Sequence, residues 1–356
     1  LETLDYARTE DGGIDLTASG RLGVAGNIAG LDLSDSTVSG DLILASAKDG
    51  LQVSTPGQSC LILDSEGVGF GGVSFGAFRA PICPETRHFL TPGKAGLSGS
   101  ARLGDLTMPV AFSSSTGSIA FRNAVMDWAG GDAVSLSAVA DAITLSLELE
   151  DSTLGIEGAQ LRLGMATRRN ASPIISARLG DTRFSGSLIP ARVSSSDFRF
   201  DATLPKSGID GSLSADGVVI RDLREDPLYQ PMTADLTATL KGSQLEMVGP
   251  LRLVSNGITV ADTLLKLDVS NLNGMAAMES RDLEFQPGGL QPWRLSDRLR
   301  GVFTDARGHL LASARFDIAS GSLNGTGEVS VSEFGFQTTR LGRVQGVNGT
   351  VIKLMK

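Results

Sequence analysis

The chain has 356 residues, of which 41% are apolar, enough to fill a substantial core and to argue against an intrinsically disordered chain. Its net charge of -9 and the lack of any long basic tract argue against electrostatic capture of nucleic acid or of an anionic membrane surface. Aromatic residues make up only 5%, whereas glycine occurs 44 times, and this balance favours strands and turns.

The N-terminal part, residues 14–53, alternates small polar and aliphatic residues between evenly spaced glycines, at Gly20, Gly30, Gly40 and Gly50. Such regular turn signals predict a meander of short antiparallel strands. Strand plus turn recurs every ~12 residues along most of the chain, which predicts roughly 25 to 30 strands. A sheet of that size must coil, close into a barrel or split into sandwiches.

The chain contains two cysteines, Cys60 and Cys83, at either side of a segment rich in glycine and proline. In an oxidising compartment a disulfide between them would close a loop and contribute about 3 kcal/mol. Two unrelated buried thiols are the alternative. The pair lacks both the spacing of a redox motif and the neighbouring histidines of a zinc site.

Strict alternation is clearest between residues 134 and 150 and returns in later segments. Aliphatic residues occupy every second position, and small polar or charged residues occupy the positions between them. This pattern is typical of a strand with one apolar and one solvated face. This parity gives the candidate residues of a continuous apolar face: Ile143, Leu145, Leu147, Leu149, Leu161, Leu163, Met165, Val329 and Val331.

Helical spacing replaces the alternation in one stretch, residues 285–301, which reads FQPGGLQPWRLSDRLRG. Pro292 suits the first turn of a helix, and Leu295 and Leu299 stand four positions apart. We predict one short amphipathic helix near 292–300, with these two leucines packed against a sheet.

This element divides the chain into a repeating β region, 1–284, the helical element itself and a continuing β region, 302–356. In the last region Val329 and Val331 share one parity whereas Phe334 and Phe336 share the other. A bulge or turn near Glu333 would place all four side chains on one face.

No set of side chains in the sequence supports an enzyme. His88 and His309 lie far apart, and neither has further ligands at the spacing of a metal site. Residues 72–76, GVSFG, match the nucleophile motif of α/β-hydrolases, but their flanks are strand-like, so a hydrolase using Ser74 with a nearby histidine is a minor alternative. We expect no catalytic residues, no metal and no cofactor.

Residues 285–292, FQPGGLQP, with Leu295 after them, resemble a stretch in the YdbH family of AsmA-like intermembrane phospholipid transport proteins. Residues 346–351, GVNGTV, are similar to that family's hairpin ahead of its C-terminal section, historically called a dicarboxylate-transport domain. Residues 82–84, ICP, resemble a Cys-Pro element of some members. The motifs cover roughly residues 280–352, and the preceding part is similar only as a glycine-punctuated series of β repeats.

The resemblance implies a long antiparallel sheet, strongly curved into an open hydrophobic groove and held in the periplasm between the inner and outer membranes. Its cargo would be phospholipids, whose acyl chains favour an apolar surface by ~0.8 kcal/mol per buried CH₂, with no covalent chemistry. Inner- and outer-membrane proteins would meet its two ends. We interpret the chain as a piece of a longer protein whose anchoring helix lies outside it.

The main alternative is a structural or surface protein of the cell envelope. In that protein, stacked β-sandwiches or a solenoid would bury the same aliphatic residues in a dry core. A lipid-facing barrel fits less well, because two Trp and two Tyr cannot supply aromatic girdles at both membrane interfaces.

Overall fold

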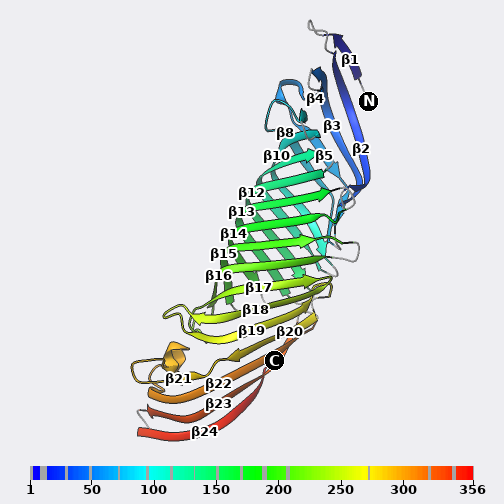
Figure 1. The fold of residues 1–356 in the computed structure, drawn as a ribbon. Helices are drawn as coiled ribbons and strands as arrows, with labels where there is room; N and C mark the ends of the chain where they lie inside the picture. The colour runs from blue at the N-terminus through cyan, green and yellow to red at the C-terminus, as the bar shows by residue number, and fades with distance from the viewer. Residues whose placement is uncertain are drawn as a thin grey trace. The chain divides into compact units, whose positions relative to one another are not determined.

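The computed structural model describes most of the chain as strand (Figure 1). The described residues are 3–8, 14–28, 31–47, 50–70, 73–93, 96–112, 115–131, 133–149, 152–168, 171–186, 191–205, 209–271, 273–319, 322–338 and 342–355. They contain 24 strands of one antiparallel sheet and three short 3₁₀ turns. The predicted class of fold, mostly β with a long antiparallel sheet, is confirmed.

The chain divides into two units. Unit 1 consists of Leu1–Glu148, Ile156–Gly180 and Arg199–Gly211, and unit 2 consists of Leu149–Gly155, Asp181–Phe198 and Ser212–Lys356. The sequence predicts different boundaries, at 285 and 302, which enclose the segment between two β regions. These boundaries stay a prediction.

Unit 1 begins with three strands in a meander and ends with three more. Its strands are β1 (Thr3–Arg8), β2 (Ile14–Ile28), β3 (Leu31–Ala47), β4 (Gly50–Ser54), β5 (Leu61–Ser65), β6 (Gly67–Phe70), β7 (Val73–Phe75), β8 (Phe78–Pro84), β9 (Thr91–Gly93), β10 (Gly96–Phe112), β11 (Ser115–Gly130) and β12 (Ala133–Leu149). One edge of β3 pairs with β2, and its other edge pairs with β4, β5 and β6 in turn. Strands β7, β8 and β9 pair with β10, so the short strands fill the space between β3 and β10.

Besides β12, whose last residue belongs to unit 2, four strands contribute to both units: β13 (Ser152–Arg168), β14 (Ile174–Gly186), β15 (Ala191–Thr203) and β16 (Asp210–Asp222). The strands of unit 2 alone are β17 (Met232–Lys241), β18 (Gln244–Leu253), β19 (Thr259–Asp268), β20 (Asn273–Ser280), β21 (Leu283–Phe285), β22 (Thr304–Ala319), β23 (Ser322–Thr338) and β24 (Gly342–Met355). Strands β17, β18, β19, β20, β22, β23 and β24 pair successively, and β21 pairs with β22 beyond the end of β20.

In several long strands, the residues that face one side of the sheet switch between odd and even positions at a bulge. In β11 the less exposed residues are Ile119 and Phe121 before Asn123 but Ala124 and Met126 after it, and Asn123 has a φ of 51°. A single residue in the left-handed region kinks the strand, so residues of opposite parity continue on the same face. Such strands are longer than the ~12-residue repeat suggests, because one bulged strand resembles two short ones in the sequence.

The bulge predicted near Glu333 is confirmed. Glu333 has a φ of 49°, and the pairing of β23 with β24 shifts register between Val331 and Phe334. Val331 is therefore half-buried and Phe334 buried although their parities differ.

The prediction of a helix over 292–300 is wrong. Two 3₁₀ turns, Pro292–Arg294 and Asp297–Leu299, occupy this stretch, and Ser296 between them is extended, with φ −152° and ψ 127°. So short a segment gains too little from helical hydrogen bonds to form without tertiary support, and here its tertiary contacts favour a looser path.

Unit 2 has the larger core. Phe285, Leu290 and Phe334 are buried in it together with residues of β16 to β19, β21 and β22, and Leu295 and Phe303 pack against it. Leu299, the other leucine of the predicted helix, is half-buried and is not part of this core. In unit 1, Leu61, Phe89 and Ala101 form one cluster of buried residues.

Candidate functional site

One face of the unit 2 sheet is apolar from β17 to β23. The register places Leu240 beside Leu245 and Leu245 beside Leu267, and at the far strands it places Ala312 beside Val329. We call the following residues the apolar face of unit 2: Leu236, Ala238, Leu240, Leu245, Met247, Leu251, Ala261, Leu265, Leu267, Ala276, Met278, Leu310, Ala312, Ala314, Phe316, Ile318, Val329 and Val331.

The opposite face of the same strands is polar and solvated. Exposed ion pairs form on it, such as Lys266 with Glu246 at 3.3 Å and Arg252 with Asp235 at 2.9 Å. Exposed pairs of this kind add little stability, but they keep this face in water. The sheet is therefore amphipathic, although Val248 and Leu311 are exposed on this mainly polar face.

Most of the apolar face is only half-buried. In the described part of unit 2, the close backbone contacts of the strands are mainly with their hydrogen-bonded neighbours, and most side chains of the face are not sealed from solvent. Val329 is 41% exposed, whereas Leu253 and Phe285, at the covered end, are 0% and 1% exposed. The face thus has a dry end and a longer stretch that remains accessible from solvent.

Unit 1 has a comparable apolar face on β11 and β12. Three of the predicted residues, Ile143, Leu145 and Leu147, are half-buried there and pair with Phe121, Ile119 and Gly117 of β11. Past the bulge at Asn123 the face continues through Met126 beside Ala138 and Trp128 beside Leu136.

The structure also locates the other predicted residues. In β13 of unit 1, Leu161 is 5% exposed, Leu163 is 37% exposed and Met165 is half-buried. The side chain of Leu149 lies outside the described part of the chain. Val329 and Val331 belong to the apolar face of unit 2, as defined above.

A loop covers part of the apolar face in unit 1. In residues 85–90, Phe89 is buried against Leu61 and Ala101, and its backbone N–H donates to the carbonyl of Val53 at 2.7 Å. We call this loop the unit 1 cover. The interruption of the strand pattern by Pro84 and His88 indicates a loop here, but nothing in the sequence showed that Phe89 packs back onto the sheet.

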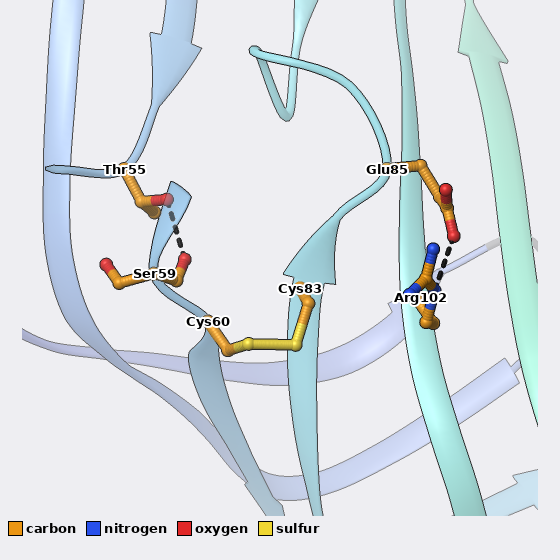
Figure 2. The surroundings of a disulfide bond; sticks show 6 residues. All are labelled: Thr55, Ser59, Cys60, Cys83, Glu85 and Arg102. Carbon is orange, nitrogen blue, oxygen red and sulfur yellow. Dashed lines mark hydrogen bonds and ion pairs between the residues drawn. A yellow bond between two sulfur atoms is a disulfide. The ribbon is translucent and has the colours of Figure 1, made fainter. Parts of the chain in front are cut away.

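The start of the unit 1 cover is fixed by covalent and ionic bonds, which Figure 2 shows. Cys60 and Cys83, the pair for which a disulfide was predicted, are joined with an S–S distance of 1.99 Å. Nearby, Nε of Arg102 in β10 donates to Glu85 at 2.6 Å, and the pKa of Arg102 is raised by this hydrogen bond and by the carboxylate charge. The loop therefore leaves β8 in one defined direction.

A longer loop, residues 286–303, covers one end of the apolar face in unit 2, and we call it the unit 2 cover. Gln291, 7% exposed, is its anchor. Its amide Nε2 donates to the carbonyls of Gln286, Leu290 and Ala306 at 2.8, 3.1 and 2.9 Å, and its Oε1 accepts the N–H of Ala306 at 2.9 Å. One buried side chain thus satisfies backbone groups on both ends of the loop.

The second irregular segment, 222–231, braces the unit 2 cover. Gln230 donates its backbone N–H to the carbonyl of Leu295 at 2.9 Å, and its side chain donates to Asp297. Arg298 pairs with Asp226 at 2.9 Å. The two irregular segments are therefore one structural element.

The residues of the hydrolase alternative are not arranged for nucleophilic catalysis. Ser74 lies within β7, beside Gly69 of β6 and Ala111 of β10, rather than at a strand-to-helix turn. His309 pairs with Asp282 at 3.0 Å in unit 2. The described residues contain no group of three or more His, Cys, Asp or Glu side chains placed to hold a metal ion.

No protein-family model, curated protein or solved structure matches the chain. Its resemblance to the YdbH family therefore stays a prediction. The described residues also include no helix with the length and apolar character needed to cross a bilayer.

Proposed function

We propose that this protein carries phospholipids between two membranes by holding their acyl chains on the apolar faces of its sheet. The observation that supports this proposal is the apolar face of unit 2, most of whose side chains are only half-buried, with Val329 41% exposed. An acyl chain on this face would remove apolar area from water, at about 25 cal/mol per Å². The headgroup would stay in water at the open side.

The side chains of the face suit movement better than tight binding. Alanines such as Ala276, Ala312 and Ala314 alternate with leucine, methionine and valine, and Phe316 is the one aromatic residue of the defined face. A surface of small aliphatic groups has no deep pocket that would hold a single lipid, so neighbouring positions bind acyl chains with similar free energies. Similar energies at successive positions permit sliding.

The proposal places the protein in the periplasm, with inner- and outer-membrane proteins at its two ends and no covalent chemistry. The disulfide between Cys60 and Cys83 is consistent with an oxidising compartment. A structural protein of the cell envelope with a dry core is the competing function, and it requires a further layer over the face.

Site-specific photo-crosslinking in cells tests the proposal. A diazirine amino acid at Val329 would report on the apolar face, and one at Glu328, the adjacent residue on the polar face, is the matched control. The same design applies in unit 1, with Leu145 as the test position and Ser146 as its control.

We expect phospholipid adducts at Val329 and Leu145 and none at Glu328 or Ser146. Protein crosslinks at Val329 and Leu145 without lipid at any position would show that a further layer covers the face, and lipid transport would then be rejected in favour of a structural role.

A further inference from the structure

We propose that Arg294, beside Trp293 in the unit 2 cover, binds the phosphate group of a phospholipid headgroup. This inference rests on the proposed function and adds to it a specific site for the polar part of the lipid. It requires no covalent step, because a guanidinium and a phosphodiester associate through charge and parallel hydrogen bonds.

Two guanidinium groups lie close to the same indole ring. The Cζ atoms of Arg294 and Arg300 are 5.2 and 4.7 Å from the centre of the Trp293 ring. Cation–π contact orients both groups beside one flat, partly apolar surface. Such a surface suits the boundary between a charged headgroup and its acyl chains.

The unit 2 cover contains three arginines, and Arg294 is the one for which the described residues include no carboxylate partner. Arg300 pairs with Asp297 at 2.6 Å, and Arg298 pairs with Asp226 at 2.9 Å. Among the described residues no carboxylate pairs with Arg294, and its Nε is shielded from solvent without a hydrogen-bond partner. That Nε is closed to a ligand where it lies, so a phosphate would bind the terminal guanidinium nitrogens, for which its oxygens are strong acceptors.

Arg294 also lies next to the apolar face. Its chain neighbour Leu295 packs in the core cluster that includes Leu310 and Val331, two members of the apolar face of unit 2. A lipid whose acyl chains lie beside Val331 would therefore bring its phosphate close to this turn. The apolar face and the unpaired cation recognise different parts of one amphiphile.

The intrinsic fluorescence of Trp293 can report binding directly. The chain has two tryptophans, so Trp128→Phe leaves Trp293 as the only indole. This variant is titrated with dihexanoyl phosphatidylglycerol below its micelle concentration, with inorganic phosphate and with an uncharged hexyl maltoside. Each titration is repeated with Arg294→Gln, and with Arg343→Gln, which removes an exposed guanidinium from β24, as the matched control.

We expect the phosphatidylglycerol to change Trp293 emission and Arg294→Gln to weaken its binding about tenfold or more, the effect of losing one charge-assisted hydrogen bond. Arg343→Gln should leave the affinity unchanged. Binding of inorganic phosphate with the same dependence on Arg294 would support the phosphate site and identify free phosphate as a ligand. Arg294→Lys, which keeps the charge without the planar fork, should bind with intermediate affinity.

Equal responses to hexyl maltoside and phosphatidylglycerol, both insensitive to Arg294→Gln, would overturn the headgroup site. An absence of any response would overturn it as well. Either result, combined with lipid adducts at Leu145 and Val329, would leave the transport proposal standing, so failure of the two proposals can be distinguished. Circular dichroism of Arg294→Gln and Arg294→Lys establishes that both variants are folded.

Discussion

Asp235 in β17 accepts the backbone N–H of Gly217 in β16, at 3.2 Å, at the point where β16 bulges with a φ of 59° for Gly217. A bulge removes an N–H from the sheet ladder, and this carboxylate replaces the lost acceptor. Its other oxygen accepts a hydrogen bond from Arg252 of β18 at 2.9 Å. One aspartate thus ties three strands together on the polar face.

The same arrangement recurs at two other bulges. Asp105 accepts the N–H of Asn123 at 3.0 Å in unit 1, and Asn348 accepts the N–H of Glu333 at 2.9 Å in unit 2. In each case the acceptor is a short polar side chain on a different strand from the bulge. At these three bulges, an exposed Asp or Asn side chain therefore supplies the hydrogen-bond acceptor that the sheet ladder lacks.

Asp235→Ala should lower the stability of unit 2 by about 1 kcal/mol, because the bulge N–H of Gly217 loses its acceptor at a solvent-screened position. The midpoint of urea unfolding measures this loss. Asp262→Ala is the control, since Asp262 forms an exposed pair with Arg281. Equal effects of the two substitutions would show that the bulge contact contributes nothing beyond a surface ion pair.

The stability contributed by Asp235 should depend on pH. The hydrogen bonds from Gly217 and Arg252 hold the pKa of Asp235 below its usual range. The folded state therefore binds this proton less readily than the unfolded state, and the stabilisation is complete above the ordinary Asp pKa of about 3.9 and is lost as pH falls through the lowered folded pKa. Asp235→Asn should be less stable than the wild type at neutral pH, and the difference should shrink on acidification. A difference that does not vary with pH would contradict this assignment.

Replacing both Cys60 and Cys83 by alanine should free the start of the unit 1 cover and reduce stability by about 3 kcal/mol. Trypsin provides a local readout, because Arg87 is exposed within the cover. Cleavage after Arg87 should accelerate in the double variant, whereas cleavage after Arg192 in β15 should not. Equal rates at Arg87 with and without the disulfide would mean that the remaining contacts of Phe89 suffice to hold the loop.

Gln291→Ala should reduce the stability of unit 2 by about 2 to 4 kcal/mol, because the N–H and carbonyl of buried Ala306 would lose their partners. Hydrogen exchange of the Ala306 amide should accelerate in the same variant. Gln286→Ala is the matched control, since the Gln286 side chain is exposed and donates to Glu284. If both variants unfold at the same urea concentration, Gln291 is not the anchor of the unit 2 cover.

Alternation of residue types was sufficient to predict the antiparallel sheet, because one apolar and one solvated face impose a period of two on every strand. The bulge near Glu333 was also predictable, since Val331 and Phe334 are large enough to show that their parities differ. The bulge at Asn123 left a similar signal, because Ile119 and Phe121 differ in parity from Met126 and Trp128, but it was not predicted, and neither was the bulge at Gln160. Their positive φ values are tolerated because neighbouring strands hold them, and that support is absent from the local sequence.

The helix over 292–300 failed as a prediction for a related reason. The spacing of Leu295 and Leu299 and the position of Pro292 were compatible with a helix, but the path of the segment depends on partners far away in sequence. Gln230 binds Leu295 and Asp297, and Asp226 holds Arg298. Local spacing cannot reveal contacts across about seventy positions, so tertiary structure overrode a weak propensity.

Outside the core around Phe285 and Phe334, the close backbone contacts of the described unit 2 strands are mainly with their hydrogen-bonded neighbours, and this has an evolutionary consequence. When interactions are confined to adjacent elements, stability is close to a sum of local contributions, as in repeat proteins. Duplication or loss of one hairpin would then change the span of the sheet by two strand spacings, about 10 Å, and leave the remaining pairs intact. The length of such a sheet could therefore change in evolution without redesign of its core.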